Sequence, residues 1–258
     1  MLEDPPFDLL CPGRRPDGIG PVLLPADEDG GVDWDGFAHL LGRVVDTTLL
    51  PGVNLWPGAI EHLDASTRAE VLATAGAALG GRPFVSGVRA DVGADGGFDP
   101  TRLAGMVDAV GRHDAVPLLL PSPALADLGP DEFVGLLAWM GDWCDRFLVV
   151  DASVPFRPGG RDWGLDVFGA AMELPACAGV VHESGSRRQE WDRLRRRDDV
   201  RPDFAVYSAN NAAVDQIMFG ADHLLDLAAA VPDVIAERDH AWAQEDPATL
   251  DFQDALQV

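Results

Sequence analysis

The sequence predicts a closed (β/α)8 barrel. Two regularities carry this prediction: short, almost continuously apolar segments alternate with amphipathic helical segments, and eight such cycles fit into 258 residues. Strands without polar alternation are typical of a parallel sheet covered by helices, and eight strand–helix cycles in a chain of this length are typical of a closed barrel. A doubly wound open sheet is the alternative. We disfavour it because no Gly-x-Gly-x-x-Gly follows the first strand.

Eight apolar segments are the predicted strands. Each is short and stops at proline, glycine or polar residues, as a strand inside a parallel sheet does. The sixth lies in the stretch 177–186, which begins apolar and breaks into His-Glu-Ser-Gly, and the eighth has the weakest pattern. In chain order, and without the sixth, the predicted strands are 20–24, 49–54, 83–88, 115–120, 146–150, 204–207 and 222–227.

Helical periodicity and capping residues predict a helix after each strand. Asp33, Asp64 and Asp99 precede three of these segments, where a carboxylate accepts hydrogen bonds from the first free backbone N–H groups. Pro100 then stands at a first helical position, which proline favours. The periodic apolar positions fall within 37–45, 71–75, 103–110, 133–140, 167–172, 187–196, 214–218 and a last segment that ends near 244.

The two ends of the chain differ from the repeating middle. Residues 1–16 are Pro-rich and aperiodic, which predicts an N-terminal arm that covers the barrel bottom or a neighbouring subunit. Residues 17–258 are predicted to form a single barrel domain with a short C-terminal helix and tail. The chain does not open with a basic region and an apolar run, and no apolar stretch reaches the length of a membrane span. We therefore expect a cytoplasmic protein without a membrane partner.

The charge of the chain is strongly negative. The formal net charge is −24, from 43 acidic and 19 basic residues, and all the basic residues are arginine. This balance argues against nucleic acid or anionic membrane as a partner. It fits a salt-loving source with an acidic proteome, because salt screens self-repulsion, although a GC-rich genome also replaces lysine by arginine. A chain without lysine cannot form a lysine Schiff base.

Several common kinds of site are not indicated. The three cysteines, Cys11, Cys144 and Cys177, are widely spaced, so neither a disulfide framework nor a zinc knuckle is predicted. The acidic loop 27–35 lacks the ligand spacing of a calcium loop. Arg193, Arg195, Arg196 and Arg197 form a cluster beside Glu190, Asp192, Asp198 and Asp199, and we interpret them as a solvent-facing helix end. We predict no cofactor and no metal.

A series of short motifs resembles one known family. The motifs are 18–33 with Asp29-Gly30-Gly31-Val32-Asp33, 63–72, Ser86-Gly87-Val88, Gly179 with Ser184-Gly185, 204–211 and Gly220-Ala221-Asp222. In this order, over about residues 17–228, they resemble the dihydrodipicolinate synthase and N-acetylneuraminate lyase family. The resemblance implies a (β/α)8 barrel, class I aldolase or lyase chemistry, a small oxo-acid ligand and a homo-oligomer or hetero-oligomer. The chain ends soon after its eighth strand, so we expect a shortened C-terminal helical region, which puts the family's tetramer in doubt.

The departures from the family fall where the resemblance places its chemistry. The Schiff-base lysine is expected two residues after Gly179, at Val181. The tyrosine proton shuttle is expected within 151–153, which has no aromatic residue, and the carboxylate-binding loop corresponds to 55–59, where only Gly58 matches. Valine offers no nucleophile and arginine stays protonated. The resemblance therefore implies a retained fold that has lost Schiff-base chemistry.

Polar residues at the predicted strand ends are the candidate site. Asp151, His182 and Glu183 are the predicted catalytic group, as acid and base or as ligands of a divalent metal, although His182 points to the helices if Val181 points inward. Arg89 is suited to a two-point grip on a carboxylate. The other polar strand-end residues are Asn54, Asp91, Ser153, Asn211 and Asp226. The predicted ligand-binding residues are Trp56, Gly58, Arg89, Ser122, Ser208 and Asn210.

Two functions stay open at this point. The first is a non-catalytic or small-acid-binding homologue of the family. The second is a lyase or hydrolase that uses a lysine-independent acid/base or metal-assisted mechanism at the C-terminal face of the barrel. The first is favoured, because no complete catalytic set can be assembled from the strand-end residues.

Overall fold

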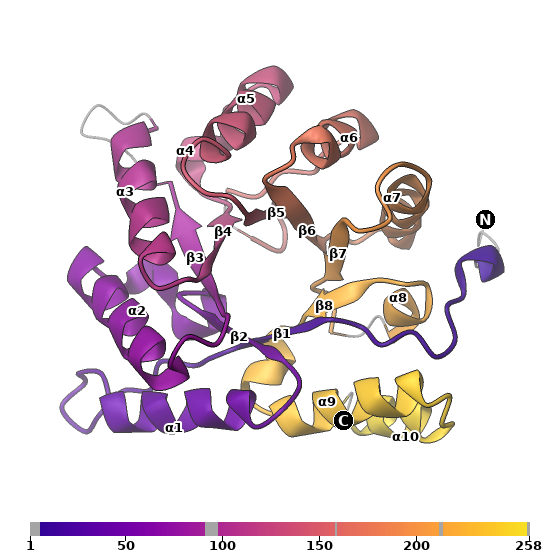
Figure 1. Cartoon of the computed structure of the whole chain (residues 1–258), viewed down its shortest axis with the longest axis horizontal. Coiled ribbons are helices and arrows are strands. Elements are labelled where there is room, and N and C mark those ends of the chain that lie inside the picture. Colours follow the sequence, from indigo (N-terminus) through magenta and orange to yellow (C-terminus); the bar gives the residue numbers. More distant parts are fainter. Residues whose placement is uncertain (1–5, 91–97, 158, 212–213, 257–258) are drawn as a thin grey trace.

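The computed structural model confirms the (β/α)8 barrel (Figure 1). It describes residues 6–90, 98–157, 159–211 and 214–256. Eight parallel strands close in chain order, with β8 paired to β1. The strands are β1 (Gly18–Pro21), β2 (Leu50–Val53), β3 (Val85–Arg89), β4 (Val116–Leu120), β5 (Phe147–Ala152), β6 (Cys177–Glu183), β7 (Ala205–Ser208) and β8 (Asp222–Leu224). The strands follow one another clockwise in Figure 1, so with right-handed crossovers this view faces the end where the strands begin.

Helices surround the barrel on its outside (Figure 1). The three predicted capping aspartates, Asp33, Asp64 and Asp99, each accept a hydrogen bond from a backbone N–H of the first turn. The helices are α1 (Trp34–Val45), α2 (Ala65–Leu79), α3 (Pro100–Gly111), α4 (Pro123–Ala126), α5 (Pro130–Met140), α6 (Leu165–Glu173), α7 (Arg187–Val200), α8 (Val214–Met218), α9 (Pro232–Ala243) and α10 (Ala248–Ala255). Short 3-10 turns are η1 (Phe7–Leu9), η2 (Trp56–Gly58), η3 (Ile60–His62) and η4 (Asp226–Ala229).

Side chains of the strands form two apolar layers. One layer fills the inside of the barrel and includes Val150, Val181 and Tyr207. The other lies between the strands and the helices and includes Val149, Val180 and the inner faces of α1 to α7. Because successive side chains of a strand point to opposite faces, this division assigns every strand residue to the inside or to the helix side. Val181 lies inside the barrel.

Two of the differences from the expected boundaries concern the start of the first strand and the C-terminal tail. The first strand begins at Gly18 rather than at residue 20, because the side chain of Asp222 accepts hydrogen bonds from Arg14 and from the backbone of Asp17, which fixes the start of β1 beside β8. The expected tail contains α10, where Asp246 caps the first turn and Gln253 bonds to Arg238 of α9. Helix α10 is thereby tied to α9.

The arginines of α7 are the main correction to the sequence interpretation. Arg193 and Arg197 are only 1% and 5% exposed, so this part of the helix is not solvent-facing. Arg197 donates to the backbone carbonyl of Gly220 at 3.1 Å, and Arg193 binds a buried carboxylate on the strands. Arg195 does lie at the surface, paired with Asp8. A buried arginine needs such partners, because desolvating an unpaired charge is costly.

The described part of the N-terminal arm packs on the outside of the barrel. Its Cys11 N–H donates to the carbonyl of Met218 at 2.9 Å, and its Asp8 carboxylate pairs with Arg195 of α7. The arm therefore runs along α7 and α8 before it leads into β1 (Figure 1). Within the described ranges, no helix has both the length and the apolar character needed to cross a membrane.

Candidate functional site

The three predicted catalytic residues do not lie on the same side of the barrel wall. Val181 and Glu183 point to the inside of the barrel, and His182 between them points to the helices. Asp151 is the register partner of His182 on β5 and lies on the same outer side. The structure therefore brings Asp151 and His182 together and places Glu183 on the other side of the wall.

Asp151 and His182 form a buried cluster between the barrel wall and α7. One carboxylate oxygen of Asp151 accepts from the Trp163 backbone N–H at 3.1 Å, and the other accepts from Arg193 at 2.5 Å. His182 Nδ1 lies 3.4 Å from that second oxygen, and its Nε2 is 3.0 Å from the Ser184 hydroxyl. Asp151, His182 and Arg193 are each 1% exposed.

This outer cluster has the chemistry of a buried structural network. Burial lowers the pKa of His182, as does the charge of Arg193, and the carboxylate of Asp151 offsets only part of that shift. The imidazole is thus held neutral at physiological pH. Over the described residues, no three His, Cys, Asp or Glu side chains are grouped so as to hold a metal ion. The cluster ties β5 and β6 to α7.

Glu190 of α7 adds a buried carboxyl to the edge of this cluster. It is 3% exposed, and neither of its oxygens has a hydrogen-bond partner among the described residues. Burial, together with the charge of Asp215, raises its pKa to about 8, against the opposing charges of Arg187 and Arg193. Its nearest cluster contact is His182 Nε2, at 3.9 Å. Glu190 is therefore mostly protonated at neutral pH.

We expect this carboxyl to make stability depend on pH. Since the pKa of Glu190 is about 8 in the folded state against an ordinary 4.5, its contribution to stability is complete below about pH 4.5 and is lost as the pH rises through about 8. Glu190→Gln should therefore stay within about 1 kcal/mol of the parent at pH 5 and exceed its free energy of unfolding by roughly 5 kcal/mol at pH 9. Urea unfolding followed by tryptophan fluorescence measures the free energy of unfolding at both pH values. Glu61→Gln, at an exposed position, is the control. Parallel pH profiles of parent and Glu190→Gln would contradict the assignment.

Glu183 lies at the mouth of the barrel, where the strands end, and is bound there by Arg157. Arg157 Nε is 2.6 Å from Glu183 Oε2, and its Nη2 is 2.8 Å from Asp226 Oδ2. The Arg157 guanidinium also stacks on the ring of Trp56, 4.1 Å from its centroid. Burial raises the pKa of Glu183, and the nearby Asp226 adds to this while Arg157 opposes it. One arginine thus joins the ends of β2, β6 and β8.

The loop that carries Arg157 lies directly on the ends of β4 and β5. A Cβ at Gly159 would stand 2.3 Å from the backbone of Ser122, and one at Gly160 would stand 2.3 Å from the carbonyl oxygen of Ala152. Gly159 also has a φ of +75°, which favours glycine. The Ser153 hydroxyl donates to Asp162 and closes the base of the loop. The loop therefore covers this side of the mouth.

The predicted ligand-binding residues lie around the mouth, but most are held by their own neighbours. Trp56 is under Arg157, and Gly58 packs against the carbonyl of Val22. Ser122 is 0% exposed, and its hydroxyl has no hydrogen-bond partner among the described residues. Ser208 accepts from the Asn210 N–H at 3.4 Å, and Arg89 ends β3 half-buried. Asp91, another strand-end candidate, lies outside the described residues.

Arg157 and Arg193 are the residues that the sequence interpretation missed. Arg157 lies in a loop without periodicity, so no local signal connects it with Glu183 or Asp226. The sequence does contain one indication that Arg193 is buried. A buried Asp151 directly after an apolar strand requires a cation, and the single dense arginine cluster was the obvious source.

A closed parallel barrel of eight strands surrounded by helices defines a (β/α)8 protein, and Arg157 and Glu183 lie at the carboxyl ends of its strands, the end at which proteins of this class generally carry their active sites. No family model matches the sequence, and no curated protein does either. Solved structures do match, and they give the fold a more particular form.

The matching structures include dihydrodipicolinate synthases. The enzyme from Bacteroides thetaiotaomicron gives a TM-score of 0.81 at 15% identity, over 94% of this chain and 80% of that one. A prophage protein of the dihydrodipicolinic acid synthase family from E. coli K12, solved in complex with pyruvate, gives 0.81 at 16% identity over the same shares. The enzyme from Thermotoga maritima gives 0.79 at 14%, over 95% and 82%. The chain therefore has the dihydrodipicolinate synthase fold, as the resemblance predicted.

Proposed function

We propose that this protein is a dihydrodipicolinate synthase-like barrel that does not use Schiff-base aldolase or lyase chemistry and acts as a non-catalytic or small-acid-binding homologue. The observation that carries the proposal is Val181. It lies at the position that the resemblance gives to the Schiff-base lysine, and its side chain is inside the barrel and 0% exposed. The resemblance expects an amine on the inward-facing side chain at this position of β6, and the side chain there is valine.

The contacts at the mouth support the same proposal. A Schiff-base enzyme of this fold needs room beside its lysine for a keto acid and its carboxylate. Here Arg157 pairs with Glu183 and Asp226, and it stacks on Trp56 in the segment that corresponds to the family's carboxylate-binding loop. A small anionic ligand would have to compete with the chain's own carboxylates for this arginine. An oligomeric assembly and a cytoplasmic location are further proposals, and they rest on resemblance and composition.

A lysine-independent enzyme is the second candidate, and Glu183 is the observation that favours it. A carboxyl with a raised pKa at the mouth of a barrel is the usual form of a general acid. Two facts weigh against this reading: Arg157 neutralises Glu183, and Asp151 with His182 faces the helices. The predicted acid and base residues therefore lie on opposite sides of the barrel wall.

Trapping with pyruvate and sodium borohydride tests the proposal. A Schiff base would be reduced to a stable secondary amine, and the intact mass would rise by one pyruvate equivalent. We expect no adduct within the folded barrel, because valine cannot condense with a ketone and the chain has no lysine.

Since the sequence has no lysine, a terminal α-amino group, such as that of Met1, is the remaining kind of primary amine that could react. Peptide mapping separates it from any internal site, and the urea-unfolded protein supplies the control for background reaction. An adduct on Met1 of equal yield in folded and unfolded protein leaves the proposal standing. An adduct inside the barrel, or turnover of a keto acid into a new product, would overturn it.

A further inference from the structure

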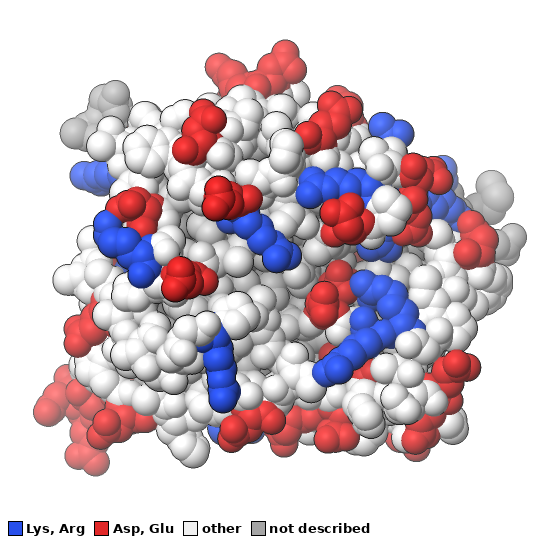
Figure 2. All heavy atoms as spheres, in the orientation of Figure 1, with Lys and Arg blue, Asp and Glu red and all other residues white. Residues whose placement is uncertain are grey.

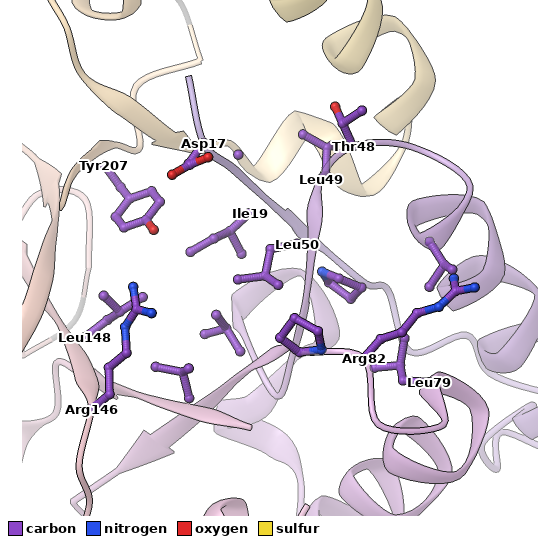
Figure 3. A pocket seen from close by; sticks show the side chains of 16 residues that line it. Asp17, Ile19, Thr48, Leu49, Leu50, Leu79, Arg82, Arg146, Leu148 and Tyr207 are labelled. Carbon is purple, nitrogen blue, oxygen red and sulfur yellow. The ribbon is translucent and has the colours of Figure 1, made fainter. Parts of the chain in front are cut away.

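A cavity of about 480 Å³ opens at the end of the barrel opposite the mouth, where the strands begin. A second cavity of about 490 Å³ lies beside it, and Val116 and Arg146 line both. Figure 3 shows the first cavity with its lining side chains. Residues of six strands line it: Ile19, Leu50, Val85, Val116, Leu148 and Tyr207.

The floor of this cavity is the innermost apolar layer of the barrel. Ile19, Val85 and Leu148 belong to the inner cluster and are at most 2% exposed. Side chains normally fill the interior of an eight-stranded barrel, and here the lowest layer ends in a hollow. Leu49 and Pro51 continue the apolar wall toward the rim. The cavity therefore suits the apolar body of a ligand.

Two hydrogen-bond donors stand together at one side of the floor. Figure 3 shows the guanidinium of Arg146 and the hydroxyl of Tyr207 on the same side, with Arg82 across the cavity. The Arg146 guanidinium makes no hydrogen bond or ion pair within the described ranges, and it is exposed to the cavity. Burial raises the pKa of Tyr207, with help from the charges of Asp222 and Asp17, so its hydroxyl keeps its proton. An arginine beside a phenol donor matches a carboxylate.

Charges around the cavity limit the ligand to a small negative charge. Asp17 lines the cavity, and Asp222 is close by but is held by Arg14 at 2.6 Å. Figure 2 views this end of the molecule and shows basic side chains set among acidic ones around its middle, while acidic side chains prevail along the lower edge. With a net charge of −24 on the chain, a phosphate of two charges would meet more repulsion than a single carboxylate.

We propose that this cavity is a binding site for a small organic acid with one carboxylate and an apolar body. Arg146 and Tyr207 hold the carboxylate, and the aliphatic part lies against Ile19, Val85 and Leu148. The site is at the opposite end of the barrel from the mouth and does not depend on the fate of the Schiff-base chemistry. It would give the fold a ligand even with Arg157 held by Glu183 and Asp226 at the mouth.

Tyr207 supplies a direct probe, because it is the chain's only tyrosine. Protein labelled with ring-¹³C tyrosine gives a single tyrosine signal set, which we expect to shift saturably when hexanoate is added. Acetate should bind about tenfold or more weakly, since it cannot bury an aliphatic chain. Hexyl phosphate and hexanol should also bind more weakly than hexanoate.

Matched variants assign the contacts. Arg146→Gln should weaken hexanoate binding about tenfold or more, as expected for loss of a charged hydrogen-bonding partner. Arg102→Gln, at the exposed start of α3, should leave binding unchanged, and both variants should keep the parent's melting temperature. The proposal fails if hexanoate does not move the Tyr207 signals, if acetate binds equally well, or if Arg146→Gln binds like the parent. It also fails if the Tyr207 signals shift with protein concentration in the absence of any added acid, because a second copy of the chain then covers the cavity.

Discussion

Replacement of Arg193 by methionine is expected to lower the free energy of unfolding by about 3–5 kcal/mol, the cost of removing one partner from a buried ion pair. Arg193 donates to Asp151 at 2.5 Å and to the carbonyl of Trp163 at 2.7 Å, and both Arg193 and Asp151 are 1% exposed. Methionine preserves much of the volume but leaves the Asp151 carboxylate without its cation. Urea unfolding at pH 7, followed by tryptophan fluorescence, measures the loss.

Arg195→Met is the matched control on the same helix. Arg195 lies two residues away, its side chain is 44% exposed, and it pairs with Asp8 at the surface. Exposed pairs of this kind contribute about 0–1 kcal/mol. A double variant, Arg193→Met with Asp151→Asn, should recover part of the lost stability, because no buried charge is then unpaired. Equal effects of Arg193→Met and Arg195→Met would show that the outer cluster is not a buried ion pair.

The fold could be predicted because its determinants are local and repeated. Each strand is an apolar run, and Asp33, Asp64 and Asp99 cap the helices that the periodicity places after three of them. That Val181 and His182 point to opposite sides of the barrel wall also follows from strand alternation, and the structure places Val181 inside. These features need no knowledge of distant contacts.

The mouth and the outer cluster could not be predicted because they depend on contacts between distant residues. Nothing near Arg157 in the chain indicates that it binds Asp226, which is 69 residues away. Helix α7 has few apolar residues among many charged ones, so its pattern does not separate the buried Arg193 and Arg197 from the exposed Arg195. In such a helix, burial is decided by which carboxylates and carbonyls the neighbouring elements present.

Replacement of Val181 by lysine is the second large expected effect, because it returns an amine to the position that the resemblance gives to the Schiff base. Val181 is enclosed by the inner apolar cluster, which includes Leu148, Val150 and Tyr207. Burial there would lower the pKa of the new lysine, and fully buried lysines shift by several units. We expect Val181→Lys to lose about 4 kcal/mol or more of stability at pH 7.

The pH dependence separates this charge effect from a packing effect. A lysine whose pKa is lowered in the folded state binds fewer protons than in the unfolded state, so the variant's stability should rise with pH up to the ordinary pKa of lysine. Val181→Met, which is similarly long and has no charge, is the control, and the gap between the two variants should narrow from pH 7 to pH 9.5. A constant gap would mean that size alone causes the loss. A stable Val181→Lys protein at pH 7 would mean that the barrel still has a polar environment for an amine, against the proposal that its interior has adapted to valine.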